Sequence, residues 1–165
     1  MAERIPAGVR VDGVPVGGLS PAEAARRLET YAREAAVRPI VVQGPQHTIT
    51  TSGAELGARA RVSEALDAAN AGRVGLIRHW LGHGESRELV LRYDLPAPDV
   101  ETLARRLGAA AAVDAAVTVD ATGVHVREAQ AGRTVDATAM ALRLSTLPPR
   151  VIVPTHPFAP RITTS

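Results

Sequence analysis

The first part of the chain changes from a strand-like to a helix-like hydrophobic pattern. Apolar and polar residues alternate over residues 9–16, which predicts a short strand pair with a tight turn. Ser20 and Glu23 then have the spacing of a capping box, and Pro21 suits the first helical position. Apolar residues follow at helical spacing up to Pro39, at Ala24, Leu28, Tyr31, Ala32 and Ala35. We therefore expect a helix from Pro21 that ends before Pro39.

A hairpin and a second helix are predicted next. Apolar runs at residues 40–42 and 48–51 flank a glycine-proline turn. Ser63 is expected to cap a helix, because apolar residues recur after it at helical spacing. A short apolar stripe over residues 74–81, which includes Trp80, predicts a short helix packed on the rest.

The second half repeats this order of elements. We expect a strand at residues 89–93, a helix from Pro98, a hairpin over residues 116–126, a helix capped by Asp136 and a strand at residues 151–153. Similar residues recur 75 to 77 positions apart, as in the pairs Pro21 and Pro98, Gly57 and Gly132, and Leu66 and Leu142. The pattern indicates a degenerate internal duplication.

The predicted fold is therefore α+β, with two similar βαββα-type units in tandem and small sheets packed with alanine-rich helices. The expected boundaries are residues 1–84 for the first unit with its short Trp-containing helix, and residues 85–154 for the second. Residues 155–165 are rich in proline and predict an extended linker to a C-terminal domain that lies outside this sequence.

Composition excludes several classes of function. The 165 residues include no cysteine, so disulfides and thiolate metal sites are excluded. Only 2% of the residues are aromatic, which disfavours sugar stacking and base stacking. The sequence pI is about 9.9, but the net charge is only +2 and the arginines are spread along the chain. Because nucleic-acid binders concentrate positive charge on one face, we expect no nucleic-acid partner.

The sequence contains no recognisable targeting signal, which leaves two possibilities for the location of the protein. No apolar run approaches the length of a membrane span, and residues 1–13 lack the hydrophobic region of a signal peptide. The protein is therefore cytosolic, or an export or anchor segment lies outside this sequence.

No residue pattern predicts a catalytic centre, a metal site or a cofactor. His79 and His83 have the spacing of half a zinc site, but no third ligand stands out nearby. The serines lie outside the motifs of known serine nucleophiles. The glycines at residues 13–18 lack the Lys-Ser/Thr ending of a phosphate-binding loop.

The segment GVRVDGVPVGGLSPAEAARRL at residues 8–28 resembles the opening of a family of peptidoglycan-binding domains. These domains precede VanW-type and L,D-transpeptidase catalytic domains in bacterial envelope proteins. Weaker agreement continues in order along the chain, at residues 55–57, 65–75, 131–136 and 160–163. The resemblance implies a non-catalytic, extracytoplasmic module behind an N-terminal membrane anchor. It implies peptidoglycan as the partner, together with the downstream domain of the same chain.

The leading hypothesis is a membrane-anchored cell-envelope module that binds or positions peptidoglycan, with contact to the peptide stems favoured over the glycan. A spacer or protein-interaction domain without a wall ligand is the alternative. An uncharacterised hydrolase is a third hypothesis, and it predicts a concave pocket with a perturbed acid or a histidine. The candidate ligand-binding residues are Arg73, Trp80 and Arg133.

Overall fold

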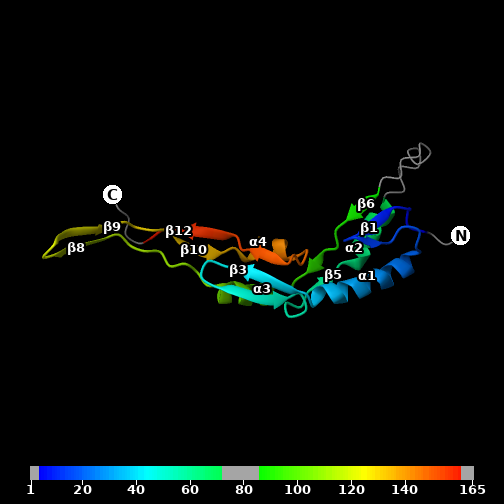
Figure 1. Ribbon diagram of the computed structural model, residues 1–165, viewed down its shortest axis with the longest axis horizontal. Helices are drawn as coiled ribbons and strands as arrows, with labels where there is room; N and C mark the ends of the chain where they lie inside the picture. Colours follow the sequence, from blue (N-terminus) through cyan, green and yellow to red (C-terminus); the bar gives the residue numbers. More distant parts are fainter. Residues whose placement is uncertain (1–3, 72–85, 161–165) are drawn as a thin grey trace. The chain divides into compact units, whose positions relative to one another are not determined.

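The computed structural model describes residues 4–71 and 86–160 (Figure 1). This part of the chain contains four helices and several small sheets, which confirms the predicted α+β class. The chain folds into two compact units. The first unit contains Met1–Pro39, Ser52–Pro96 and Ser145–Leu147, and the second contains Ile40–Thr51, Ala97–Leu144 and Pro148–Ser165. These units interleave along the chain and do not coincide with the consecutive segments expected from the sequence.

The first unit combines a three-stranded sheet, a two-stranded sheet and a helix pair. Its elements are β1 (Val9–Val11), β2 (Val14–Pro15), α1 (Pro21–Ala36), β5 (Arg59–Ala60), α2 (Val62–Asn70), β6 (Arg87–Leu89) and β7 (Tyr93–Asp94). The larger sheet has the order β2-β1-β6, in which β2 is antiparallel and β6 parallel to β1. The smaller sheet pairs β5 with β7 in antiparallel register. α1 and α2 contact each other.

Helix α1 begins where the sequence predicts. The Ser20 hydroxyl accepts a hydrogen bond from the Glu23 backbone N–H at 3.4 Å, and the Glu23 carboxylate accepts one from the Ser20 N–H at 2.9 Å. These bonds pair two backbone donors that the helix itself leaves free. One face of α1 is buried, at Ala24, Leu28, Ala32 and Ala35. The capping box and the buried face therefore confirm the predicted helix.

The hydrophobic core of the first unit lies between α1, α2 and the larger sheet. Its buried members are Ile5, Val9, Val11, Val16, Ala24, Leu28, Ala32, Ala35, Ala65, Ala69, Leu91 and Tyr93. Most of the helix residues among them are alanines, so the helices approach the sheet closely and contribute little apolar area each.

The second unit contains a three-stranded sheet, a helix pair and two further strand pairs. Its elements are β3 (Pro39–Gln43), β4 (Thr48–Ser52), α3 (Ala97–Leu107), β8 (Ala116–Asp120), β9 (Gly123–Arg127), β10 (Gly132–Val135), α4 (Ala137–Leu144), β11 (Arg150–Ile152) and β12 (Thr155–Phe158). Pro39 and Ser52, at the ends of β3 and β4, belong to the first unit. The sheet order is β11-β3-β4, with β11 parallel to β3. β10 pairs with β12, and β8 pairs with β9.

Local signals again fix the elements of the second unit. The Asp136 carboxylate accepts a hydrogen bond from the Ala139 N–H at 2.9 Å, which confirms Asp136 as the cap of α4. Both predicted hairpins are present, as β3–β4 and β8–β9. The buried apolar side chains of this unit are Ile40, Val42, Val100, Leu103, Leu107, Met140, Leu144, Val151 and Val153.

The two units, each taken by itself, share one scheme of pairing. In each, two adjacent strands form an antiparallel pair whose first strand accepts a third, parallel strand that follows much later in the chain. Each unit also has a pair of contacting helices, and a short antiparallel pair that joins the strand before the second helix to a strand after it.

Two local predictions were wrong. The strand expected at residues 89–93 is split, because β6 pairs with β1 while β7 pairs with β5, and the buried Leu91 lies between them. Ser63 is not a cap: α2 begins at Val62, because Arg61 at the cap position still donates its N–H to the Arg92 carbonyl at the end of the β5–β7 pair.

Two further segments bear on the expected boundaries. Thr155–Phe158, at the start of the segment expected to be a linker, forms β12 and pairs with β10. The short helix expected at residues 74–81 lies outside the described residues.

Candidate functional site

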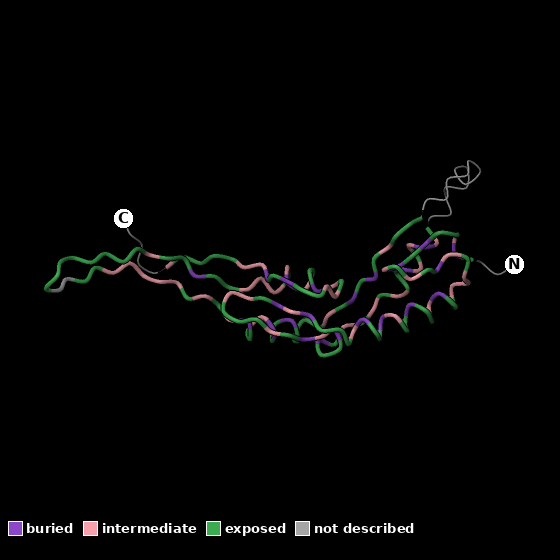
Figure 2. The backbone as a smooth tube through the Cα atoms, viewed as in Figure 1, coloured by how far each residue is buried: buried purple, intermediate pink, exposed green. Residues whose placement is uncertain are grey.

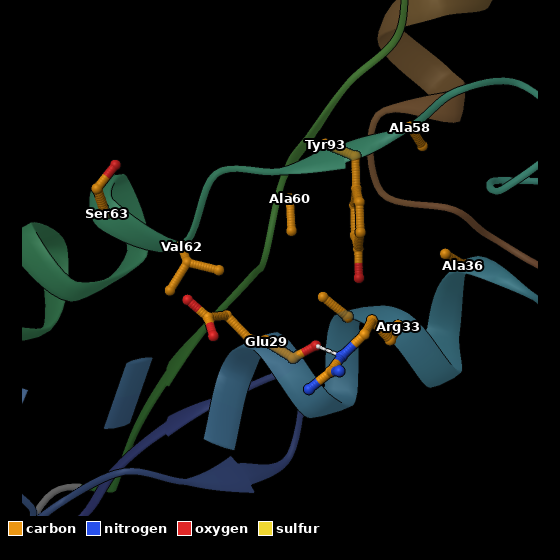
Figure 3. A pocket seen from close by; sticks show the side chains of 9 residues that line it. Glu29, Arg33, Ala36, Ala58, Ala60, Val62, Ser63 and Tyr93 are labelled. Carbon is orange, nitrogen blue, oxygen red and sulfur yellow. Dashed lines mark hydrogen bonds between the residues drawn. The ribbon is translucent and has the colours of Figure 1, made fainter. Parts of the chain in front are cut away.

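A hollow of about 630 Å³ lies in the first unit, between α1 and the strand β5 (Figure 3). α1, the region of β5, the start of α2 and β7 all contribute to its wall. The lining residues are Glu29, Ala32, Arg33, Ala36, Ala58, Ala60, Val62, Ser63 and Tyr93.

Small side chains keep the hollow open. Glu29, Ala32, Arg33 and Ala36 follow the i, i+3, i+4, i+7 spacing of one helix face, so α1 presents two charged groups and two methyl groups along one line. The opposite wall is also formed by small side chains, at Ala58, Ala60 and Val62. Larger side chains at these positions would fill the space. The wall therefore combines small apolar side chains, which suit groups of methyl size, with the polar groups of Glu29, Arg33, Ser63 and Tyr93.

Charged groups lie at the exposed border of the hollow. The Arg33 Nε donates to the backbone carbonyl of Glu29 at 3.3 Å (Figure 3). Arg33 Nη2 donates to the Thr30 hydroxyl at 3.4 Å. In residues 4–71 and 86–160, neither Glu29 nor Arg33 forms an ion pair. The Glu29 carboxylate thus stays open to a cation, and Arg33 keeps N–H donors for an anion.

The Tyr93 side chain points into the hollow from β7 (Figure 3). Tyr93 is only 3% exposed, and its hydroxyl has no hydrogen-bond partner among the described residues. A buried polar group without a partner costs about 1–3 kcal/mol, so such groups are rare in folded proteins. The hydroxyl is therefore a donor and acceptor that a bound group could pair.

Burial also changes the ionisation of this phenol. It raises the pKa of Tyr93 from 10.0 to about 12, and the nearby Tyr31 and Asp12 add smaller contributions in the same direction. The folded state therefore keeps the neutral phenol at pH values where an exposed tyrosine ionises.

This shift makes the stability of the protein depend on alkaline pH. A pKa raised by folding contributes stability below pH 10, and that contribution is lost as the pH rises through 10 towards 12. We expect the free energy of unfolding to fall by about 2–3 kcal/mol over this range through Tyr93 alone. Urea unfolding of wild type and Tyr93→Phe at pH 8, 10, 11 and 12 measures the contribution as the difference between the two curves.

The stability of the Tyr93→Phe variant at pH 8 provides a control for this experiment. It removes a buried hydroxyl without a partner, so it should be at least as stable as wild type at pH 8. If the two proteins lost the same stability between pH 10 and 12, the burial of the phenol would not be the cause.

Of the ligand-binding residues predicted from the sequence, Arg133 is the one that falls among the described residues, and it does not line this hollow. Arg73 and Trp80 lie outside the described residues, as do His79 and His83. Arg133 lies in β10 of the second unit, opposite Pro157, and its backbone N–H donates to the Ala110 carbonyl at 2.8 Å. Its side chain is exposed, and it makes no ion pair within the described part of the chain.

Sequence reasoning missed the polar residues of the hollow. The face at Glu29 and Arg33 is visible in the helical spacing of α1, next to the buried alanines. Tyr93 gave no such signal, because its position over α1 depends on the pairing of β7 with β5, across more than thirty residues.

Two other features, a metal site and a membrane-spanning helix, are not found among the described residues. Across residues 4–71 and 86–160, no three histidine or acidic side chains gather in a way that could hold a metal ion. In the same residues, none of the helices has the length and hydrophobicity that crossing a membrane requires. Comparisons with protein-family models, curated proteins and solved structures gave no match to this chain.

Proposed function

We propose that this protein is a non-catalytic module of the cell envelope that holds peptidoglycan through its peptide stems, in the hollow of the first unit. The observation that carries this proposal is the buried Tyr93 hydroxyl, which faces the hollow without a partner. The resemblance of residues 8–28 to peptidoglycan-binding domains supports two parts of the proposal, the location in the cell envelope and peptidoglycan as the ligand.

The chemistry of the hollow suits a short peptide of small residues. Alanine methyl groups fit between the small side chains of α1 and β5, and a carbonyl or carboxylate of the peptide can accept from Tyr93 or Arg33. Glu29 can accept from an ammonium group. Glycan binding is less well supported, because the hollow offers no exposed aromatic face on which a sugar could stack.

A second part of the proposal concerns the origin of the two units. The shared pairing scheme supports an internal duplication, and so do the repeated residues 75 to 77 positions apart. In such a duplication α1 corresponds to α3, and α2 corresponds to α4.

The two alternative functions, a spacer and a hydrolase, require different features of the hollow. A spacer needs no ligand, and leaves the Tyr93 hydroxyl without a role. A hydrolase needs a nucleophile or a base at the hollow; its lining residues include Ser63 and Glu29 but no histidine. Release of soluble fragments from peptidoglycan by the purified protein would favour the hydrolase.

Retention on purified sacculi at physiological salt tests the proposal. Wild type should be retained, and Ala60→Leu should be released because the larger side chain fills the hollow. Tyr93→Phe should bind about tenfold more weakly, as expected for the loss of one hydrogen bond in a buried site. Ala22→Leu, on the exposed side of α1, is the matched control and should bind like wild type.

The outcomes separate the hypotheses. No retention of wild type would favour the spacer. Retention that disappears for all variants with modest added salt would indicate nonspecific adsorption through the arginines. A loss of retention in Arg133→Ala but not in Ala60→Leu would move the ligand site to β10, as the sequence alone predicted.

A further inference from the structure

The hairpin β8–β9 exposes an apolar face. Val117 and Val126 are directly opposite each other, and Val124 lies two residues from Val126 on the same strand, so all three share one face. These valines are 61–66% exposed. In Figure 2 the hairpin is a mostly green, exposed length of backbone tube that extends from the rest of its unit. An uncovered apolar face of this kind marks an interaction surface or an aggregation hazard.

In the described part of the chain, no third strand adds to this hairpin. Among the described residues, β8 and β9 pair only with each other and form a separate two-stranded sheet. Two-stranded hairpins are marginally stable alone, and additional strands or a covering helix normally stabilise them.

The hairpin β3–β4 shows how this chain completes such a sheet. β3–β4 follows α1 and precedes β5, just as β8–β9 follows α3 and precedes β10. Unlike β8–β9, it has a third strand: β11 adds to β3 in parallel, with Val151 opposite Val42, and Ile40 and Val42 are buried. The turn after β3 lies against α3, because a Cβ built on Gly44 would come within 2.7 Å of the Leu107 Cβ.

Chain order indicates where the partner comes from. The elements that contact the β3–β4 hairpin, α3 and β11, both follow it in the chain. By the same order, the elements that complete β8–β9 would follow β12.

We propose that β8–β9 is the docking sheet for a segment of the same polypeptide that follows β12. This segment adds a strand in parallel to β8, as β11 adds to β3, and lays an amphipathic helix over Val117, Val124 and Val126. Backbone hydrogen bonds along β8 give the contact its register, and the valine face gives it an apolar core. The hairpin thereby connects this module to the part of the protein that it positions.

Amide hydrogen exchange tests this proposal, with the 165-residue chain compared with the full natural polypeptide. In the longer polypeptide, amides of β8 should exchange at least tenfold more slowly than in the 165-residue chain, at every protein concentration. Val117→Ser with Val126→Ser should lower the Tm of the longer polypeptide and leave that of the 165-residue chain unchanged. Val37→Ser, at an exposed valine after α1, is the matched control and should change neither.

Three results would overturn the proposal. The β8 amides could exchange equally fast in both proteins, or the natural polypeptide could end at Ser165. Protection that rises with the concentration of the 165-residue chain would instead assign the hairpin to contact between two copies.

Discussion

Leu144→Ala is expected to lower the free energy of unfolding by about 2–5 kcal/mol, while Leu142→Ala on the same helix changes it by less than about 0.5 kcal/mol. Leu144 is fully buried, whereas Leu142 is 66% exposed. Both substitutions remove the same atoms from α4, so the difference measures burial and the cavity left behind. Urea unfolding followed by circular dichroism gives both values.

The pair of variants tests whether α4 packs as described. Equal losses at the two positions would contradict the orientation of α4, because only one face of the helix is buried. Since Met140 is also buried and lies one turn before Leu144, Met140→Ala should resemble Leu144→Ala.

Gly17→Ala is the second substitution with a large expected effect, a loss of about 1–3 kcal/mol. A Cβ at Gly17 would lie 2.8 Å from the Gly8 nitrogen and 2.8 Å from the Pro6 oxygen. Both neighbours are backbone atoms, so they cannot move aside as a flexible side chain could. The Gly17 N–H also donates to the Val9 carbonyl at 3.0 Å, and the clash would weaken this bond.

Gly13→Ala provides the comparison for this effect. Gly13 has a φ of +77° but open space around its Cβ position, so alanine there costs only the left-handed backbone, about 1 kcal/mol. Thermal unfolding of both variants distinguishes crowding from backbone strain. A smaller loss in Gly17→Ala than in Gly13→Ala would contradict the close approach of the backbone at Gly17.

The sequence predicted those helices and hairpins that are specified by residues close together in the chain. Ser20 with Glu23 predicted the start of α1, and Asp136 predicted the start of α4, because each cap acts within three residues. The hairpins were visible because two apolar runs flank a short turn.

Pairings between distant segments were not predictable in this way. The parallel pairs β1–β6 and β3–β11 join strands more than seventy residues apart, and no residue in either strand specifies its partner. The candidate site was not predicted for the same reason. Tyr93 reaches the hollow only through the pairing of β7 with β5, which are distant in sequence. The sequence instead pointed to Arg73, Trp80 and Arg133; the first two lie outside the described residues, and Arg133 lies in β10 of the second unit.

The claim that a wall peptide occupies the hollow is tested most directly by NMR. A soluble peptidoglycan stem peptide is added to the ¹⁵N-labelled protein, and the backbone amide shifts are followed. We expect saturable shifts confined to the hollow, at residues 29–36, 58–63 and 93, and their loss in Ala60→Leu. Shifts confined to β10 around Arg133, or no shifts at millimolar peptide, would contradict it.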